Sequence, residues 1–358
     1  MISYLADIHK GTIDSQHHLL KYALFISFFP QIIQGPIPRY EQLEEQLVTG
    51  HTFDEKNFSK SLQMILWGLF LKFMIANKAS VIVNNVFDNY EGYTGFYVLI
   101  AGILYSIQLY TDFLSCVCIS QGSAGLFGIH LVDNFHHPYR AASIKDFWNR
   151  WHISLSRWLR DYIYIPLGGN RKGTLRKYLN LMITFLISGF WHGRGLQFLL
   201  WGLLHGLYQV IGSLTFHVRS RIYALLQISR DSLFGKLIQR ITTFFLVMIG
   251  WIIFRAKDIP QGLTMLRSMF TTYNPWILFD DSLFSLGLVW KEWIILLLSI
   301  LLLIAVECIQ EKICIRDKIL AQPLILRWII YLGAIWVIWV FGSYGSDFIA
   351  QNFIYGDF

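Results

Sequence analysis

Three histidines lie in or beside apolar segments of this chain, where an imidazole could do chemistry. His192 ends the apolar run of SGFWHGRG, His205 lies in WGLLHGLY, and His152 follows a tryptophan in NRWHIS. A titratable side chain at membrane depth is costly and normally faces a cavity, a partner or a substrate path. A neutral imidazole, with an ordinary pKa of about 6.5, can accept a proton from an attacking hydroxyl. The three residues are therefore candidates for proton transfer.

Each histidine also has an ordinary structural interpretation. His192 precedes Gly193 and Gly195, which would let the backbone bend and a substrate approach, but a histidine at a helix end can simply hydrogen-bond a carbonyl. His152 could line the same site or belong to a solvated helix face. On one continuous helix, the 13 residues from His192 to His205 would turn the chain by about 220°, so these two side chains would point to different sides.

A carboxylate, Asp112, lies within the apolar segment that contains QLYTDFLS. Such a group needs a partner or a water-filled cavity. Asp112 could pair with an arginine and hold two helices together, or it could take part in proton transfer. The sequence leaves both interpretations open.

Motifs of several common enzyme classes are missing from the sequence. It contains no GxSxG elbow, no HExxH zinc pair and no glycine-rich phosphate loop, and LGGNRKG lacks the spacing of a nucleotide fingerprint. Cys116 and Cys118 form a CxC without a second pair at metal-ligand spacing, so we interpret them as structural thiols. We expect neither a metal site nor a disulfide framework.

The elements that must position these residues are apolar segments. The 358 residues are 54% hydrophobic, 16% aromatic and 15% charged, against roughly 25% charged in a typical soluble domain, and the mean hydropathy is +0.45. This composition predicts an all-α, polytopic membrane bundle forming one domain over residues 1–358. The formal net charge of +7 is carried by basic residues between hydrophobic segments, where they anchor loops. We therefore expect the lipid bilayer as a partner and no nucleic acid.

The apolar segments predict roughly six to nine membrane spans. Pro30, Gly35 and Pro36 interrupt the first segment, which is expected to be broken or re-entrant. The segments lie near residues 19–35, 61–77, 95–119, 178–192, 195–213, 239–254, 293–309 and 326–342.

The connection between Arg140 and Lys177 is strongly basic, with nine lysines and arginines. The positive-inside rule places it on the cytoplasmic side. In residues 141–165 aromatic and basic side chains interleave, which is typical of a helix lying in the membrane interface. Pro166, Gly168 and Gly169 then predict a turn.

Several long motifs resemble the membrane-bound O-acyltransferase family, in the branch of alginate and peptidoglycan O-acetylation proteins that is related to the teichoic acid D-alanine transfer protein. The ending FGSYGSDFIAQNFIYGDF also resembles this branch, so the resemblance covers nearly the whole chain. The other motifs are SFFPQIIQGPIPRY at 27–40, DFWNRWHISLSRWLRDYIYIPLGGNRKG at 146–173, FWHG at 190–193 and the following LLWGLLHG.

The resemblance implies the site residues and the fold. It implies that His192, in the WHG motif, is catalytic and that His152, in the RWH motif, is a second functional position. The family fold is a ring of transmembrane helices around a thinned centre, where acyl donor and acceptor meet from opposite sides. Relatives have DFSGYSD-like sequence where this chain has DFLSCVC at 112–118, so only the first acid is kept. Residues expected to support the two histidines are Asp112, Trp191, Asn149 and His205.

The function implied by the resemblance is transfer of a small acyl group, acetyl, from a cytoplasmic thioester such as acetyl-CoA toward an extracytoplasmic polysaccharide. No bound cofactor is implied. The implied partner is an exported or membrane-anchored acetyltransferase, and the implied location is the cell membrane. The alternatives are D-alanyl transfer to teichoic acid and an inactive membrane scaffold. The YIPLGG form of the central loop resembles the acetylating members and favours acetyl.

The start of the chain carries a further expectation. Relatives commonly have several more hydrophobic segments before a sequence resembling SYLADIHKG, whereas this sequence reaches that point at its beginning. We therefore expect a ring-like fold that is short of its N-terminal helices.

Overall fold

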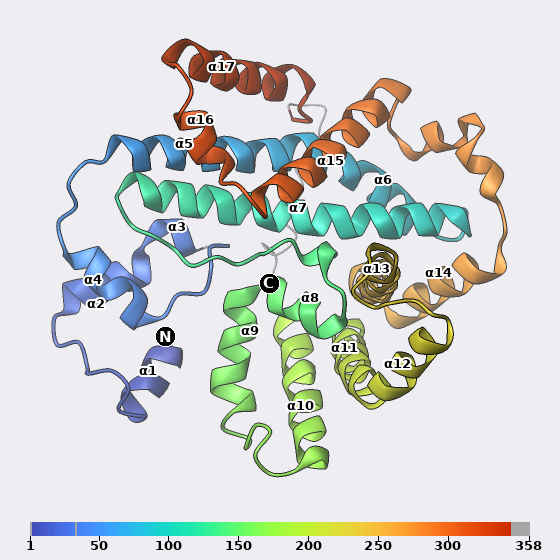
Figure 1. The fold of residues 1–358 in the computed structure, drawn as a ribbon, viewed down its shortest axis with the longest axis horizontal. Helices are drawn as coiled ribbons and strands as arrows, with labels where there is room; N and C mark the ends of the chain where they lie inside the picture. Colours follow the sequence, from blue (N-terminus) through green and yellow to red (C-terminus); the bar gives the residue numbers. More distant parts are fainter. Residues whose placement is uncertain (1, 33, 345–358) are drawn as a thin grey trace. The chain divides into compact units, whose positions relative to one another are not determined.

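The computed structural model describes residues 2–32 and 34–344, which form helices and loops without a β-strand in those ranges (Figure 1). The all-α prediction is confirmed. The described residues form two compact units: the first takes its residues from 2–32, 34–85, 107–133 and 278–344, the second from 86–106 and 134–277. The last fourteen residues, which include most of the C-terminal family-like motif, lie outside the described ranges.

The first unit contains the helices from both ends of the described chain. α6 and α7 also contribute residues to the second unit. The helices are α1 (Ile2–His9), α2 (Leu19–Ser27), α3 (Phe29–Ile32), α4 (Tyr40–Val48), α5 (Glu55–Phe70), the π-helix η1 (Leu71–Ala76), α6 (Asn77–Asp88), α7 (Phe96–Leu126), η5 (Asp281–Leu286), α15 (Trp290–Gln310), α16 (Ile315–Leu320) and α17 (Leu324–Phe341).

The second unit contains the helices from the middle of the chain. They are η2 (Pro138–Arg140), α8 (Ile144–Arg150), α9 (Ile153–Leu159), the π-helix η3 (Arg160–Tyr164), α10 (Thr174–His192), α11 (Leu196–Leu214), α12 (Phe216–Leu225), α13 (Leu233–Arg255), α14 (Ile259–Thr271) and η4 (Pro275–Leu278).

Five helical stretches in the described ranges are long and apolar enough to cross a membrane. α11 and α12, bent by 59° at their junction, make a sixth if they form one span. The prediction of a multi-pass membrane protein is confirmed. Five spans are fewer than the predicted six to nine, and a count of six would match the lower end of that range. The five stretches are Glu55–Asp88, Phe96–Leu126, Leu233–Arg255, Trp290–Gln310 and Leu324–Phe341.

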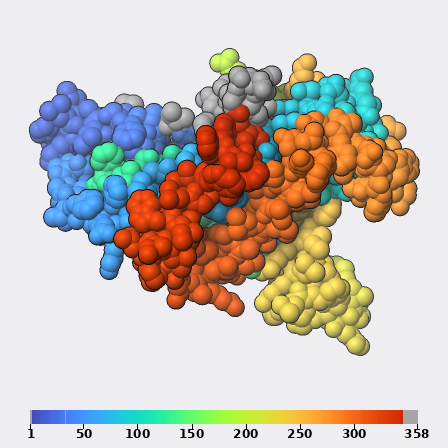
Figure 2. Space-filling model, turned by 90° about the horizontal axis from the view of Figure 1, so that it is seen from above, coloured from blue at the N-terminus to red at the C-terminus, as the bar shows by residue number. Residues whose placement is uncertain are grey.

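The last long helices expose their apolar side chains. Only 17% of the most apolar window of α15, and 6% of that of α17, is buried. Figure 2 shows these helices, orange and red, on the surface of the molecule. Soluble proteins rarely leave large contiguous apolar surfaces to water, so this exposure fits contact with lipid.

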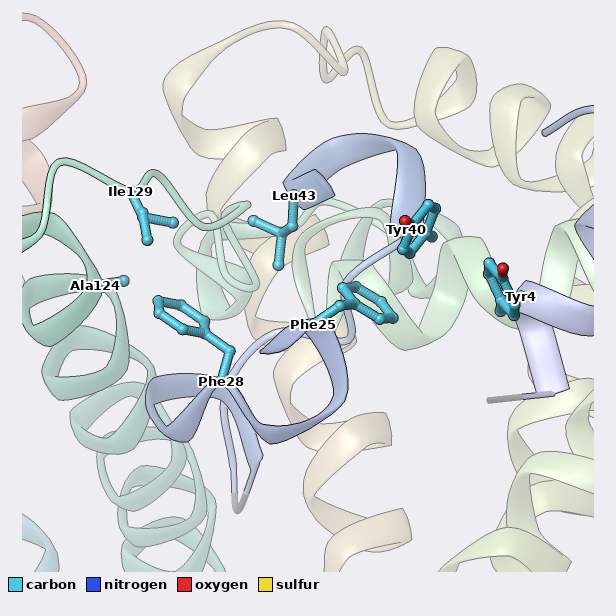
Figure 3. Close-up of a cluster of buried hydrophobic side chains, with 7 residues drawn as sticks. All are labelled: Tyr4, Phe25, Phe28, Tyr40, Leu43, Ala124 and Ile129. Carbon is cyan, nitrogen blue, oxygen red and sulfur yellow. The ribbon is translucent and has the colours of Figure 1, made fainter. Parts of the chain in front are cut away.

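The segment predicted at 19–35 is broken, as expected. α2 ends at Ser27 and Phe28 is extended (φ −64°, ψ 99°) before α3 begins. A small aromatic core holds this region (Figure 3): the Tyr40 ring lies 4.9 Å from that of Tyr4 and 5.1 Å from that of Phe25. The Gln16 amide donates to the Tyr40 hydroxyl at 3.0 Å. Ring packing therefore stabilises short helices that could not hold together by their own propensity.

α10 and α11 run side by side in the second unit (Figure 1). A Cβ at Gly189 or Gly202 would overlap the carbonyl oxygen of Phe198 or Phe185, respectively, so only glycine permits this approach. Small residues are the usual means by which membrane helices pack closely. α13 packs on α11, and α8 packs on both α11 and α13. These four helices surround the histidines.

The segment predicted as an interfacial helix is helical but not continuous. α8 ends at Arg150 and α9 begins at Ile153. Between them His152 has a left-handed backbone conformation, with a φ of +44°. The predicted turn that follows is confirmed by the positive φ of Gly168 (+106°) and Gly169 (+56°). The side of the membrane on which this segment lies stays a prediction.

Candidate functional site

The second unit brings the three histidines into one cluster of aromatic rings. His152 is 4% exposed, His192 3% and His205 0%. Rings of Trp148, Trp191, Trp201 and Trp251 contact them. An imidazole so deeply surrounded by rings pays a large desolvation cost when protonated, which favours its neutral form.

His192 lies at the end of α10, where the chain turns back into α11. Its ring centroid lies 5.1 Å from that of Trp201 and 5.3 Å from that of Phe254, both in edge-to-face geometry. A Cβ at Gly193 would come within 2.5 Å of the Phe198 ring, so glycine is required for this turn. The bend predicted from the two glycines is therefore present.

His205 lies across the α10–α11 pair and contacts the same tryptophan as His192. Its ring centroid is 5.1 Å from that of Trp201, and its Nδ1 accepts a hydrogen bond from Nε1 of Trp148 at 3.3 Å. The expectation that His192 and His205 point to different sides assumed one continuous helix. It is wrong because the helix breaks after His192, and the two antiparallel pieces face one another.

His152 occupies the position just before α9, in a left-handed backbone conformation (φ +44°). Its Nδ1 lies 3.2 Å from Oδ1 of Asn134. Burial, and to a smaller extent His192, lowers the pKa of His152 to about 3. The interpretation of His152 as part of a solvated helix face is therefore wrong, since the side chain is buried.

Trp191 contacts both candidate histidines. Its ring centroid lies 4.9 Å from that of His192 and 6.2 Å from that of His152, and its side chain is half exposed. The structure thus brings His152, Trp191 and His192 together. Asn149, expected to support the site, lies on the exposed side of α8.

Asp112 belongs to the first unit, where it forms an ion pair with Lys72. The Lys72 Nζ lies 2.5 Å from Asp112 Oδ1, and the two side chains are 14% and 5% exposed. The pairing joins the π-helix η1 to α7. The sequence-based interpretation named an arginine as the partner, and the structure corrects it to a lysine. This geometry supports the structural interpretation of Asp112.

Residues that the sequence did not single out complete the cluster. Trp201 and Phe254 contact His192, and Asn134 contacts His152. Trp201 and Phe254 could not be distinguished from the many other apolar residues of their helices. Asn134 lies in a loop 18 residues before His152, and no sequence periodicity links the two.

The residue types that commonly bind metals are not arranged as a metal site in the described part of the chain. Within the residues that the structure describes, no group of three or more histidine, cysteine or acidic side chains is placed to hold a metal ion. Cys116 and Cys118 are buried thiols, and Cys308 and Cys314 are exposed thiols. The chemistry available at the histidine cluster is proton transfer by imidazoles in surroundings with little water.

Comparison with known proteins gives a family match over most of the chain. Residues 10–255 match the MBOAT, membrane-bound O-acyltransferase, family. The chain is 36% identical to "Probable alginate O-acetylase AlgI" of Pseudomonas putida over 276 residues, which are 77% of this chain and 54% of that protein. It is 37% identical to the peptidoglycan O-acetyltransferase of Helicobacter pylori over 257 residues, which are 71% and 47% of the two chains.

A more distant similarity extends to another kind of transferase. The teichoic acid D-alanyltransferase of Bacillus subtilis is 28% identical over 268 residues, which are 72% of this chain and 66% of that protein. The chain spans about half the length of the acetylating relatives. All three candidate histidines lie inside the residues that match the family.

Proposed function

Because the chain belongs to the membrane-bound O-acyltransferase family, we propose that it transfers an acyl group from a thioester to a hydroxyl, with His192 as the catalytic base and His152 beside it. One observation carries this assignment. Two buried imidazoles, His192 and His152, meet at Trp191 within the matched region. Burial keeps both imidazoles neutral, which is the form that can accept a proton from a hydroxyl.

The proposed chemistry balances without a cofactor. The imidazole of His192 takes the hydroxyl proton while the hydroxyl oxygen attacks the thioester carbonyl. The carbon–sulfur bond then breaks, and the leaving thiolate receives the proton from the imidazolium. The rings around His192 keep water away, which limits hydrolysis of the thioester.

The acyl group proposed is acetyl, and the acceptor belongs to a polysaccharide pathway. Two relatives that are more than a third identical are named as O-acetylating proteins acting on alginate and peptidoglycan. We place the basic connection at 140–177 on the cytoplasmic side, acetyl-CoA as the donor there, and the chain in the cell membrane as one domain. An exported or membrane-anchored acetyltransferase is the partner in this proposal.

D-alanyl transfer is the second candidate function. The 28% identity to a teichoic acid D-alanyltransferase favours keeping it, although the acetylating relatives are more similar. The two functions differ in donor. Turnover of acetyl-CoA supports the first, and turnover of a D-alanyl carrier protein supports the second.

The test is His192→Ala, with acyl transfer measured both as thiol release from each donor in reconstituted membranes and as polysaccharide acetylation in a complemented deletion strain. We expect a loss of about 10² to 10⁴ in rate, typical of a lost general base, with membrane insertion retained. His217→Ala, which removes an exposed histidine of α12, is the matched control and should keep full activity. Near-normal transfer by His192→Ala at equal protein level would refute the assignment and favour an inactive scaffold or another base.

A further inference from the structure

Asn134 makes an unusually dense set of contacts with the start of α9. Its side chain is almost fully buried, at 1% exposure. Its Oδ1 accepts from the Ser154 backbone N–H at 3.0 Å and from the Ser154 hydroxyl at 2.8 Å, and lies 3.2 Å from Nδ1 of His152. Its backbone carbonyl accepts from the Ile153 N–H at 3.0 Å. One residue of a distant loop therefore holds three consecutive residues around His152.

These contacts identify which atom of the Asn134 amide faces His152. A backbone N–H can only donate, so the amide atom that meets the N–H of Ser154 must be the oxygen. The same oxygen lies against Nδ1 of His152. Because an amide oxygen can only accept, Nδ1 of His152 must carry a proton. In the neutral ring the lone pair then belongs to Nε2.

The backbone at His152 adds a second, independent sign that this geometry is imposed. A positive φ is uncommon outside glycine because the Cβ atom crowds the neighbouring carbonyl oxygen. It persists only where the surroundings hold it, and such positions cluster at functional sites. Here the bonds from Ile153 and Ser154 to Asn134 hold it.

We propose that Asn134 is a positioning residue that fixes His152 in its Nδ1–H tautomer, so that Nε2 is the atom that accepts hydrogen bonds from the reacting groups. This inference rests on the proposed function of the His152–His192 site. The role resembles that of the carboxylate in a Ser-His-Asp triad, which holds its imidazole in one tautomer. A neutral amide stabilises the imidazolium less than a carboxylate would, so the protonated form of His152 gains less from this partner.

The groups around His152 allow us to predict how a negative charge at position 134 would change its pKa. Burial is the main cause of the lowered pKa of His152, and His192 of α10 adds to it, whereas Asn134, which contacts it from the loop, is neutral. Asn134→Asp keeps an acceptor oxygen but places a negative charge beside the Nδ1 proton. It should raise the pKa of His152 because an opposite charge favours the protonated ring.

The experiment compares pH–rate profiles of acyl transfer for Asn134→Asp, Asn134→Leu and the control His217→Ala. In Asn134→Asp the acid limb should move to higher pH, with activity recovering toward alkaline pH. Asn134→Leu removes the acceptor, and kcat should fall about 10- to 100-fold at all pH values, as for other lost orienting partners, with KM for the donor little changed. His217→Ala, at an exposed position of α12 outside the site, should keep the wild-type profile.

The outcomes separate this inference from the proposed function. If His192→Ala is active, the proposed function fails. If His192→Ala is inactive but Asn134→Asp keeps the wild-type profile, or loses activity equally at every pH, Asn134 does not control the protonation of His152 and this inference is overturned. Should Asn134→Leu fail to fold, as judged by thermal unfolding in detergent, the Asn134→Asp profile alone decides.

Discussion

The two units accommodate buried polar groups in opposite ways. The first unit buries a full charge pair, Lys72 with Asp112, between a π-helix and a long membrane helix. The second unit buries imidazoles among tryptophan and phenylalanine rings and pairs one of them with a neutral amide, Asn134. Each arrangement avoids an isolated charge, which would be costly in hydrocarbon.

The difference indicates which region can exchange protons. In an ion pair each partner stabilises the charged form of the other. Moving a proton from one partner to the other would remove both charges and the attraction between them. An imidazole held neutral by burial can accept a proton from a substrate and return it. The comparison therefore supports a structural role for the Lys72–Asp112 pair and agrees with the chemistry proposed for the cluster around His192.

Breaking the charge pair should have the largest effect on stability. Lys72→Met leaves the Asp112 carboxylate buried without its ammonium and should cost about 3–5 kcal/mol, whereas Lys72→Met with Asp112→Leu should recover most of this loss. Thermal unfolding in detergent measures both. Lys60→Met, which breaks an exposed pair with Asp317, is the control and should unfold as the wild type does. If the single Lys72→Met variant were as stable as the wild type, the Lys72–Asp112 pair would have no structural role.

A smaller effect is expected from crowding the second unit. A Cβ at Gly250 would lie 2.6 Å from Nε2 of His205, so Gly250→Ala should displace that ring and weaken its bond to Trp148. Overpacking of this kind typically costs about 1–3 kcal/mol, and we also expect acyl transfer to fall. Gly333→Ala meets no atom within 4 Å and should leave unfolding and activity unchanged. If Gly250→Ala were as stable and as active as Gly333→Ala, the ring cluster would tolerate displacement of His205, and this prediction would be wrong.

The smallest expected effect is a dependence of stability on mild acid. The pKa of His152 is about 3 in the folded chain and about 6.5 when unfolded, so the unfolded state binds the proton first. Its contribution is complete above about pH 6.5 and is lost progressively as the pH decreases toward the pKa of the folded state.

Unfolding measured between about pH 5 and 6.5 should therefore have a shallower pH slope in His152→Asn, since asparagine does not titrate and tolerates a positive φ. His217→Asn, at an exposed position, should keep the wild-type slope. Equal slopes in all three proteins would show that His152 is not held neutral.

Much of the fold follows from sequence patterns, and less of the site does. The apolar runs predicted α7, α13, α15 and α17, because a long hydrophobic stretch has few alternatives to a helix in lipid. The glycines after His192 predicted the turn there. For Asp112 the sequence could predict only that its partner carries a positive charge. A carboxylate in an apolar segment needs a cation nearby, but the sequence does not say which residue supplies it.

The sequence by itself determined that this chain is a helical membrane protein, that it belongs to its family, and that His152 and His192 are the residues to consider. Tertiary structure decided that both histidines meet at Trp191, that His205 shares Trp201 with His192, and that Oδ1 of Asn134 lies against Nδ1 of His152. The reason is physical. Helix formation depends on residues near one another in the chain, whereas the tautomer of a buried imidazole depends on whichever polar atom the fold brings against it.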